Sequence, residues 1–163
     1  MAASPMDQFV TLSSALTGIA SGILAPGIDP IDIKQTYFDT AQQADPTVFG
    51  QLLTIVANNS TLPPQQLADL VLQQSGDDVR FLARAIMLAW YLGNWYDPGD
   101  LKLYAGPNPP PTPIAFRVIT MNAYTKGFAW SVAQAHPMGF STNIFGYWSA
   151  APPSLTDYIG SGA

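Results

Sequence analysis

Few side chains in this sequence can do acid–base, nucleophilic or metal chemistry. The 163 residues include one histidine, eleven aspartates, no glutamate and no cysteine. A histidine that acts as a general base needs an orienting partner, and the sequence identifies none for His136. Asp77 and Asp78 form the only adjacent acidic pair, but consecutive residues point about 100° apart on a helix, so they do not share a metal ion. We predict no catalytic residue and no metal site in this chain.

The composition limits the classes of ligand. Charged residues make up 10% of the chain, against about 25% in typical soluble domains. The net charge of −5 comes with no basic patch, which excludes nucleic acid as a partner. The glycines are dispersed and no strand–helix–strand unit is predicted, so the chain is not expected to bind FAD, NAD or ATP by itself. The shortage of charge predicts that a protein partner covers part of the surface.

Proline-containing starts predict helices in the first half of the chain, because proline fits the first turn of a helix. Three such starts are Asp29-Pro30, Asp45-Pro46 and Thr61-Leu62-Pro63-Pro64. A fourth helix, the longest, is predicted from Ser75 to about Gly93. Ser75 and Asp78 have the spacing of a capping box, with aspartate in place of glutamate.

The second half of the chain is less regular. Five prolines between Pro107 and Pro113 favour an extended, semi-rigid crossing segment. A last helix is predicted over 116–134, with its apolar stripe at Val118, Met121, Thr125, Phe128 and Val132. The expected fold class is all-α: a small helical bundle with a long Pro-rich crossing loop and an irregular aromatic C-terminal arm. We expect a single domain, 1–163, in which 1–134 form the helical body and 135–163 form a partner-wrapping arm.

The most aromatic element is the helix that ends near Gly93, in the stretch AIMLAWYLGNWYDP. Its apolar run is shorter than the roughly 20 residues that a membrane span needs, so we predict a buried helix. One face carries Val79, Leu82, Ile86, Trp90 and Gly93, and a nearly opposite face carries Phe81, Ala85, Leu88, Leu92 and Trp95. Both faces require burial. Either the chain's own helices or a partner can provide it.

Three stretches, taken together, resemble one protein family. They are DQFVTLSSALTG near the start, ARAIMLAWYLGNWYDP in the centre and HPMGFSTNIFGYWSAAPP near the end. In this order and spacing they resemble the small subunit of bacterial FAD-dependent sugar and polyol dehydrogenases, the group of membrane-bound sorbitol, fructose and glucose dehydrogenases. The resemblance covers both ends of the chain and the central helix.

This resemblance implies a non-catalytic subunit bound to a large flavoprotein of the glucose-methanol-choline oxidoreductase type, often accompanied by a multihaem cytochrome c. In that family FAD and the catalytic histidine belong to the large subunit. Family small subunits typically carry a twin-arginine signal and help to fold and export the large subunit. A periplasmic location is therefore implied, although this sequence shows no such signal. Some relatives have cysteine where this chain has His136, before Pro137, so the association expected here is non-covalent.

The partner interface is predicted from the aromatic helix and the arm. Its residues are Trp90, Tyr91, Trp95, Tyr96, Phe128, His136, Pro137, Phe140, Phe145, Tyr147 and Trp148. We expect the arm from Pro137 to Pro153 to lie on the large subunit, near its substrate entrance. Two other functions stay open from the sequence. One is a stand-alone small-molecule enzyme that uses His136 with a nearby aspartate or tyrosine, and the other is an interfacial membrane protein anchored by Trp90, Trp95 and Trp148.

Overall fold

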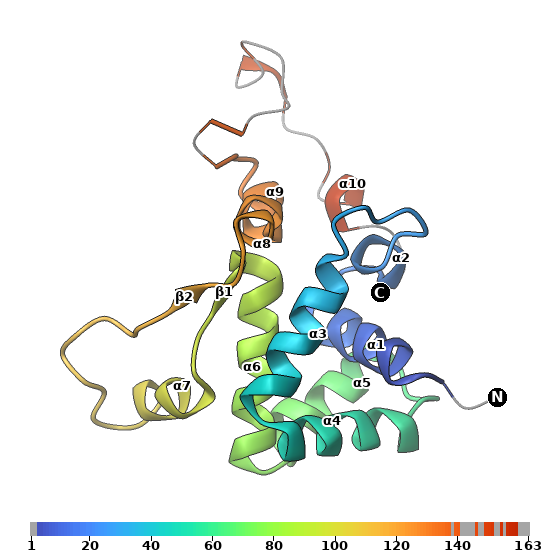
Figure 1. Cartoon of the computed structure of the whole chain (residues 1–163), viewed down its shortest axis with the longest axis vertical. Helices are drawn as coiled ribbons and strands as arrows, with labels where there is room; N and C mark the ends of the chain where they lie inside the picture. Colours follow the sequence, from blue (N-terminus) through green and yellow to red (C-terminus); the bar gives the residue numbers. More distant parts are fainter. Residues whose placement is uncertain are drawn as a thin grey trace.

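The computed structural model is a bundle of helices with a short two-stranded sheet at one side (Figure 1). It describes residues 3–137, 139–140, 146, 149–151, 154 and 156–159. The helices of the first half are α1 (Pro5–Thr17), α2 (Ser21–Leu24), α3 (Ile33–Ala44), α4 (Pro46–Asn58), α5 (Pro64–Asp69), the π-helix η1 (Leu70–Gln74) and α6 (Asp77–Leu92). The later elements are β1 (Asn94–Trp95), α7 (Pro98–Tyr104), β2 (Arg117–Val118), α8 (Met121–Lys126), α9 (Phe128–Val132) and α10 (Thr156–Ile159). The all-α class is confirmed. Among the described residues, no helix combines the length and the hydrophobicity that crossing a membrane requires.

Helix α1 was not predicted, although its start carries a local signal. Ser4 and Asp7 form a capping box, because the Ser4 hydroxyl accepts from the Asp7 backbone N–H at 3.1 Å and the Asp7 carboxylate accepts from the Ser4 backbone N–H at 3.0 Å. These two bonds satisfy backbone donors that a helix start leaves unpaired. The helix ends at Gly18, whose φ of 72° is the left-handed conformation that favours glycine.

Two of the three predicted proline starts are confirmed and one is displaced. Helix α4 begins at Pro46, and the Asp45 carboxylate caps it by accepting from the Val48 N–H at 2.9 Å. Helix α5 begins at Pro64. Helix α3 begins at Ile33, three residues after Pro30. The cause is local, since Asp32 has a left-handed φ of 51° and so ends the turn that precedes the helix.

Helix α6 runs as predicted from Asp77 to Leu92 and ends at Gly93, which has a φ of 66°. The predicted capping box at its start is wrong. The N-cap residue is Gly76, which offers no side-chain bond. The Ser75 hydroxyl instead donates to the Leu70 carbonyl at 3.0 Å, where it covers the end of η1.

The chain's own helices cover both apolar faces of α6. Helix α6 contacts α1, α3, α4, α7, α8 and α9, and stands among them in Figure 1. Val79, Leu82 and Ile86 are buried on one face, and Phe81 and Ala85 on the other. A helix that is apolar on two sides belongs in the interior of a bundle, and α6 takes that place here.

The single helix predicted over 116–134 is wrong. Residues 117–118 form β2, which pairs antiparallel with β1, and two short helices follow, separated at Gly127. The β-branched run Val118, Ile119 and Thr120 favours the strand. The Thr120 hydroxyl then starts α8 by accepting from the Ala123 N–H at 3.0 Å. The expected stripe is lost with the helix, because Val118, Met121 and Val132 are exposed.

The segment predicted as a Pro-rich crossing begins with a helix, α7, that was not predicted. The Asp97 carboxylate caps it by accepting from Gly99 and Asp100, and Lys102 near its end pairs with Asp77 of α6 at 3.2 Å. The proline segment beyond is held by the Tyr104 hydroxyl, which donates to the Thr112 carbonyl at 2.7 Å. Helix α7 and this loop lie together at one side of the bundle, at the left of Figure 1.

The last described helix returns to the body. In α10 the Ile159 carbonyl accepts from the Ala20 N–H at 2.9 Å, and the Ile159 side chain packs against the core. Figure 1 shows α10 beside α2. This end of the predicted arm therefore contacts the chain itself.

Candidate functional site

Acidic and histidine side chains are scattered over the described part of the chain. Within it, no group of three or more His, Cys, Asp or Glu side chains is placed to hold a metal ion. Asp77 and Asp78 take part in ion pairs, with Arg80 at 3.0 Å from Asp77 and Lys102 at 3.9 Å from Asp78. The Arg80 pair lies within α6, and Lys102 joins the first turn of α6 to α7, so both pairs have a structural role.

Trp90 and Trp95, two predicted interface residues, belong to the chain's own core. Their exposed fractions are 2% and 6%. The Trp90 ring contacts Tyr37 edge-on, with centroids 4.6 Å apart, and stacks near Phe9 at 6.4 Å. Such aromatic pairs stabilise a core beyond the area they bury. We therefore leave both tryptophans out of the candidate surface.

Tyr91, a third predicted interface residue, is half-buried and ties α6 to the end of α1. Its hydroxyl donates to the Thr17 carbonyl at 2.8 Å. Burial raises the pKa of Tyr91, and raises that of Tyr37 more strongly, because the ionised phenolate is disfavoured away from water. Both phenols stay neutral and serve packing.

Phe128 lies at the junction where α8 and α9 dock on the C-terminal end of α6. Its ring is half-buried, 6.3 Å from that of Trp90. Two glycines permit the close approach there. A Cβ on Gly93 would overlap backbone atoms of Ala123 and Tyr124, and a Cβ on Gly127 would lie 2.7 Å from the Tyr91 carbonyl oxygen. The end of α6 thus fixes the position of α8 and of β2 before it.

Tyr96 contacts Phe116, which lines a groove beside the sheet. The two rings lie 5.5 Å apart. The groove has a volume of about 500 Å³ and lies between the end of α3, the start of α7 and the β2 strand. Its lining residues are Thr40, Gln43, Ala44, Trp95, Asp97, Asp100, Ala115, Phe116 and Arg117. Asp97 caps α7 through one carboxylate oxygen, which accepts from the Gly99 and Asp100 N–H groups.

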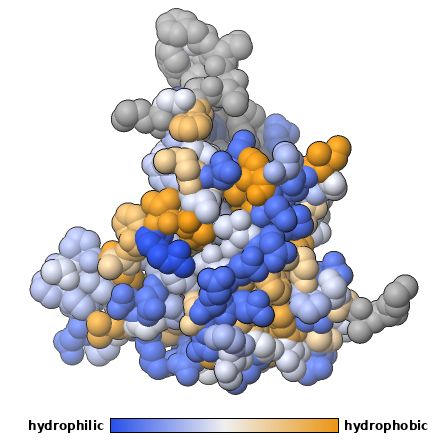
Figure 2. Space-filling model, viewed as in Figure 1, coloured by the Kyte–Doolittle hydropathy of each residue, from blue (hydrophilic) through white to orange (hydrophobic). Residues whose placement is uncertain are grey.

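An exposed apolar surface runs from this groove along β2 to the start of α8. Phe116, Val118 and Met121 are 56%, 48% and 65% exposed. Figure 2 shows hydrophobic surface gathered over the sheet, at the left centre of the view. We call these three residues and Arg117 between them the β2–α8 surface. Exposed apolar residues that cluster in this way mark binding sites more often than isolated ones do.

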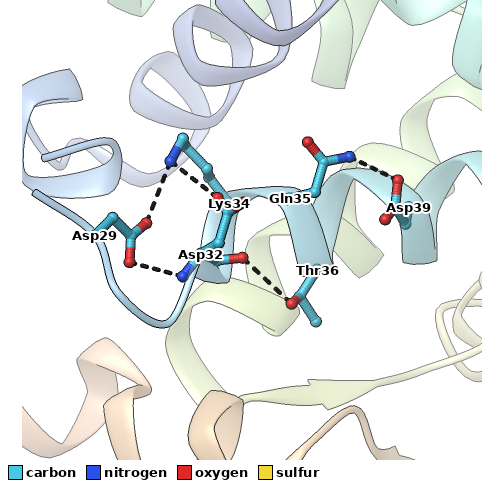
Figure 3. Close-up of polar contacts among 6 residues, drawn as sticks. All are labelled: Asp29, Asp32, Lys34, Gln35, Thr36 and Asp39. Atoms are coloured by element: carbon cyan, nitrogen blue, oxygen red, sulfur yellow. Dashed lines mark hydrogen bonds and ion pairs between the residues drawn. The ribbon is translucent and has the colours of Figure 1, made fainter. Parts of the chain in front are cut away.

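Away from this surface, Ile28 lies in the loop between α2 and α3, where it is 89% exposed. Polar contacts hold this loop (Figure 3). The Lys34 ammonium lies 2.9 Å from Asp32 and 3.3 Å from Asp29, and Asp29 also accepts from the Asp32 N–H at 2.8 Å. The hydrogen bond with Asp32 raises the pKa of Lys34. Lys34 pairs with both carboxylates and offsets one of their two negative charges, so this cluster is an ion-paired loop.

The arm is described only in part. His136 is half-buried, with Nδ1 3.0 Å from the Pro137 carbonyl oxygen, and Pro137 is buried. Phe140 is exposed. The predicted interface residues Phe145, Tyr147 and Trp148 lie outside the described residues.

The residues that sequence reasoning missed are those of the β2–α8 surface. Val118 and Met121 were assigned to the buried stripe of a helix, and Phe116 and Arg117 were given no role. One signal was present, because three consecutive residues from Val118 to Thr120 are β-branched and Thr120 has cap spacing to Ala123.

Comparison of this chain with models of protein families, with curated proteins and with solved structures finds no match. The resemblance to dehydrogenase small subunits stays a prediction that rests on the three sequence stretches.

Proposed function

We propose that this chain is the non-catalytic small subunit of a heteromeric FAD-dependent sugar or polyol dehydrogenase. It stabilises the catalytic flavoprotein and escorts it to the periplasm. FAD and the catalytic histidine belong to the partner, a large subunit of the glucose-methanol-choline oxidoreductase type, and a multihaem cytochrome c is a further candidate member of the complex.

The observation that carries this proposal is the β2–α8 surface. The core of the bundle does not depend on it, since Phe81 and Trp90 of α6 are buried among the chain's own helices. Phe116, Val118 and Met121 nevertheless face outward. Burying such side chains against a partner would remove their apolar area from water, which favours association. A binding role therefore suits this chain better than catalysis does.

Two of the three family-like stretches support the proposal through the way they pack. DQFVTLSSALTG lies in α1 and its C-cap, and ARAIMLAWYLGNWYDP covers most of α6 and the residues after it. These stretches meet through the Phe9 and Trp90 rings and through the Tyr91 bond to Thr17. Residues that resemble the family are thus the residues that build the framework of this bundle.

Co-expression tests the escort role. The flavoprotein subunit, sought in the reading frame beside this one, is expressed with and without the full chain, and the FAD bound to the exported flavoprotein is measured. We expect FAD-loaded, exported flavoprotein to depend on the chain. Equal loading and export without it would refute the proposal.

His136 provides the control for a catalytic alternative. In the proposed function His136→Ala leaves the sugar dehydrogenase activity of the assembled complex within about twofold of the wild type, because the histidine does not touch substrate. A purified chain that turns over a substrate alone, and loses this activity in His136→Ala, would instead establish a stand-alone enzyme.

A further inference from the structure

The charges of this chain are distributed unevenly along the sequence. Ten of its eleven aspartates lie within residues 1–100, and the eleventh is Asp157. Residues 101–156 contain no acidic residue and three basic ones, Lys102, Arg117 and Lys126. An acidic protein therefore carries one segment with a net positive charge, and that segment includes the β2–α8 surface.

Two of these three basic side chains are unpaired within the described residues. Lys102 is engaged with Asp77 and Asp78 of α6. Arg117 and Lys126 are exposed and form no ion pair with any described residue. Asp97 and Asp100 line the same groove as Arg117, but neither pairs with it. The two cations are thus available to carboxylates of a partner.

The outer edge of β2 offers backbone groups as well. Asn94 is opposite Val118 and Trp95 is opposite Arg117, and the Ile119 N–H donates to the Gly93 carbonyl at 3.1 Å. Hydrogen-bonded and non-hydrogen-bonded pairs alternate along an antiparallel ladder, so Val118 occupies a non-hydrogen-bonded position. Its N–H and C=O consequently point away from β1. The sheet has no third strand among the described residues to receive them.

We propose that an extended segment of the catalytic subunit adds a third strand along the outer edge of β2. Its carboxylates meet Arg117 and Lys126, and its alternate apolar side chains pack on Val118 and Met121. Strand addition of this kind takes affinity from backbone hydrogen bonds and specificity from alternating side chains. The inference rests on the proposed function for the identity of the partner. Beyond the proposed function, it names the face of this chain that binds the partner, and it predicts that the binding segment carries acidic and apolar side chains.

Site-specific cross-linking in the native host tests this docking. The full chain carries the photo-cross-linking residue p-benzoylphenylalanine in place of Met121, or in place of Gln51 as the control. Gln51 is an exposed position on α4, in the acidic first half of the chain. We expect a covalent adduct with a flavin-containing protein from position 121 and none from position 51. The cross-linked peptide of the partner should contain Asp or Glu.

Matched variants test the charge pairs and the backbone hydrogen bonds separately. Arg117→Glu should lower the adduct yield about tenfold, because a close charge pair becomes repulsive. Arg84→Glu makes the same change of charge at an exposed arginine of α6 and should leave the yield within about twofold. Val118→Pro removes the outward N–H at an edge position where proline is tolerated, and should also lower the yield about tenfold. Val118→Ala keeps the N–H and loses only part of the apolar contact, so it should lower the yield less than Val118→Pro does.

The outcomes distinguish this inference from the proposed function. One contrary outcome is a flavoprotein that co-purifies with the chain and yet cross-links from position 51, or gives the same adduct yield with Arg117→Glu. Either result would refute docking at the β2 edge and leave the proposed function standing. An adduct with a flavin-free protein that responds to the same variants would keep the edge and refute the proposed function. No adduct from position 121, or an adduct with a second copy of this chain, would overturn the inference.

Discussion

Replacing Gly93 with alanine tests how the β2–α8 surface is held on the bundle. Gly93 ends α6 in the left-handed conformation, with a φ of 66°. A Cβ at this position would overlap the backbone of Ala123 and Tyr124. Because those atoms belong to α8, the substitution must either push α8 away from α6 or disfavour the folded state.

The loss of stability in Gly93→Ala has two parts, and the same substitution at a second glycine, Gly18, measures one of them alone. A left-handed residue with a Cβ costs about 1–2 kcal/mol, and forcing an extra carbon into a packed site costs about 1–3 kcal/mol more. We therefore expect Gly93→Ala to lower the free energy of unfolding by about 2–5 kcal/mol. Gly18 has a similar φ of 72° at the end of α1, but a Cβ there meets no atom within 4 Å. Gly18→Ala should show only the conformational cost, about 1–2 kcal/mol.

Urea unfolding followed by circular dichroism measures both variants under the same conditions. The expected result is a greater loss for Gly93→Ala, by about 1–3 kcal/mol. A Gly93→Ala chain that fails to fold, beside a folded Gly18→Ala chain, agrees with the same reasoning. Equal losses of stability for the two variants would show that α8 does not lie against the end of α6, and would refute this account of how α8 is held.

Three further predictions concern the framework. Hydrogen bonds with Ser4 lower the pKa of Asp7 below its ordinary value of 3.8, so the Asp7 carboxylate stabilises the fold above that pH, and this contribution is lost as the pH falls through the folded-state pKa. The difference in melting temperature between wild type and Asp7→Asn should therefore become smaller from about pH 6 to about pH 3. A difference that does not change with pH would contradict the capping box. Tyr91→Phe removes the bond to Thr17 and should lower the free energy of unfolding by about 0.5–1.5 kcal/mol in urea titrations, and no loss would argue against that bond. Trp90→Ala should cost about 3–5 kcal/mol, whereas Met121→Ala should change stability by less than about 0.5 kcal/mol; similar losses would mean that Met121 is not on the surface.

Local signals explain which elements could be predicted from the sequence. Helices α4, α5 and α6 were found because their prolines and Gly93 act within one turn of the helix end. The single helix over 116–134 failed for tertiary reasons. Its apolar spacing is helical, but pairing with β1 holds 117–118 as a strand, and Gly127 lies against Tyr91 of α6. Neither contact is visible in a window of neighbouring residues.

The candidate surface was harder to predict than the fold. Aromatic content directed attention to Trp90 and Trp95, which the chain's own helices bury. The pattern of α6 shows that two faces need cover, but not which residues provide it. In the sequence, the exposed residues Phe116, Val118 and Met121 look like the apolar residues of the core. They face outward because residues 116–134 form β2 and two short helices instead of one long helix.

The most direct measurement of the central claim is the flavin absorbance of protein that elutes with the affinity-tagged full chain from its native host. Three chains are compared: wild type, Met121→Asp on the β2–α8 surface and Gln51→Asp on α4. We predict that wild type and Gln51→Asp elute with a protein that contains FAD, and that Met121→Asp elutes without flavin although it remains folded. Elution of the wild-type chain without flavin would contradict a role as subunit of a flavoprotein dehydrogenase.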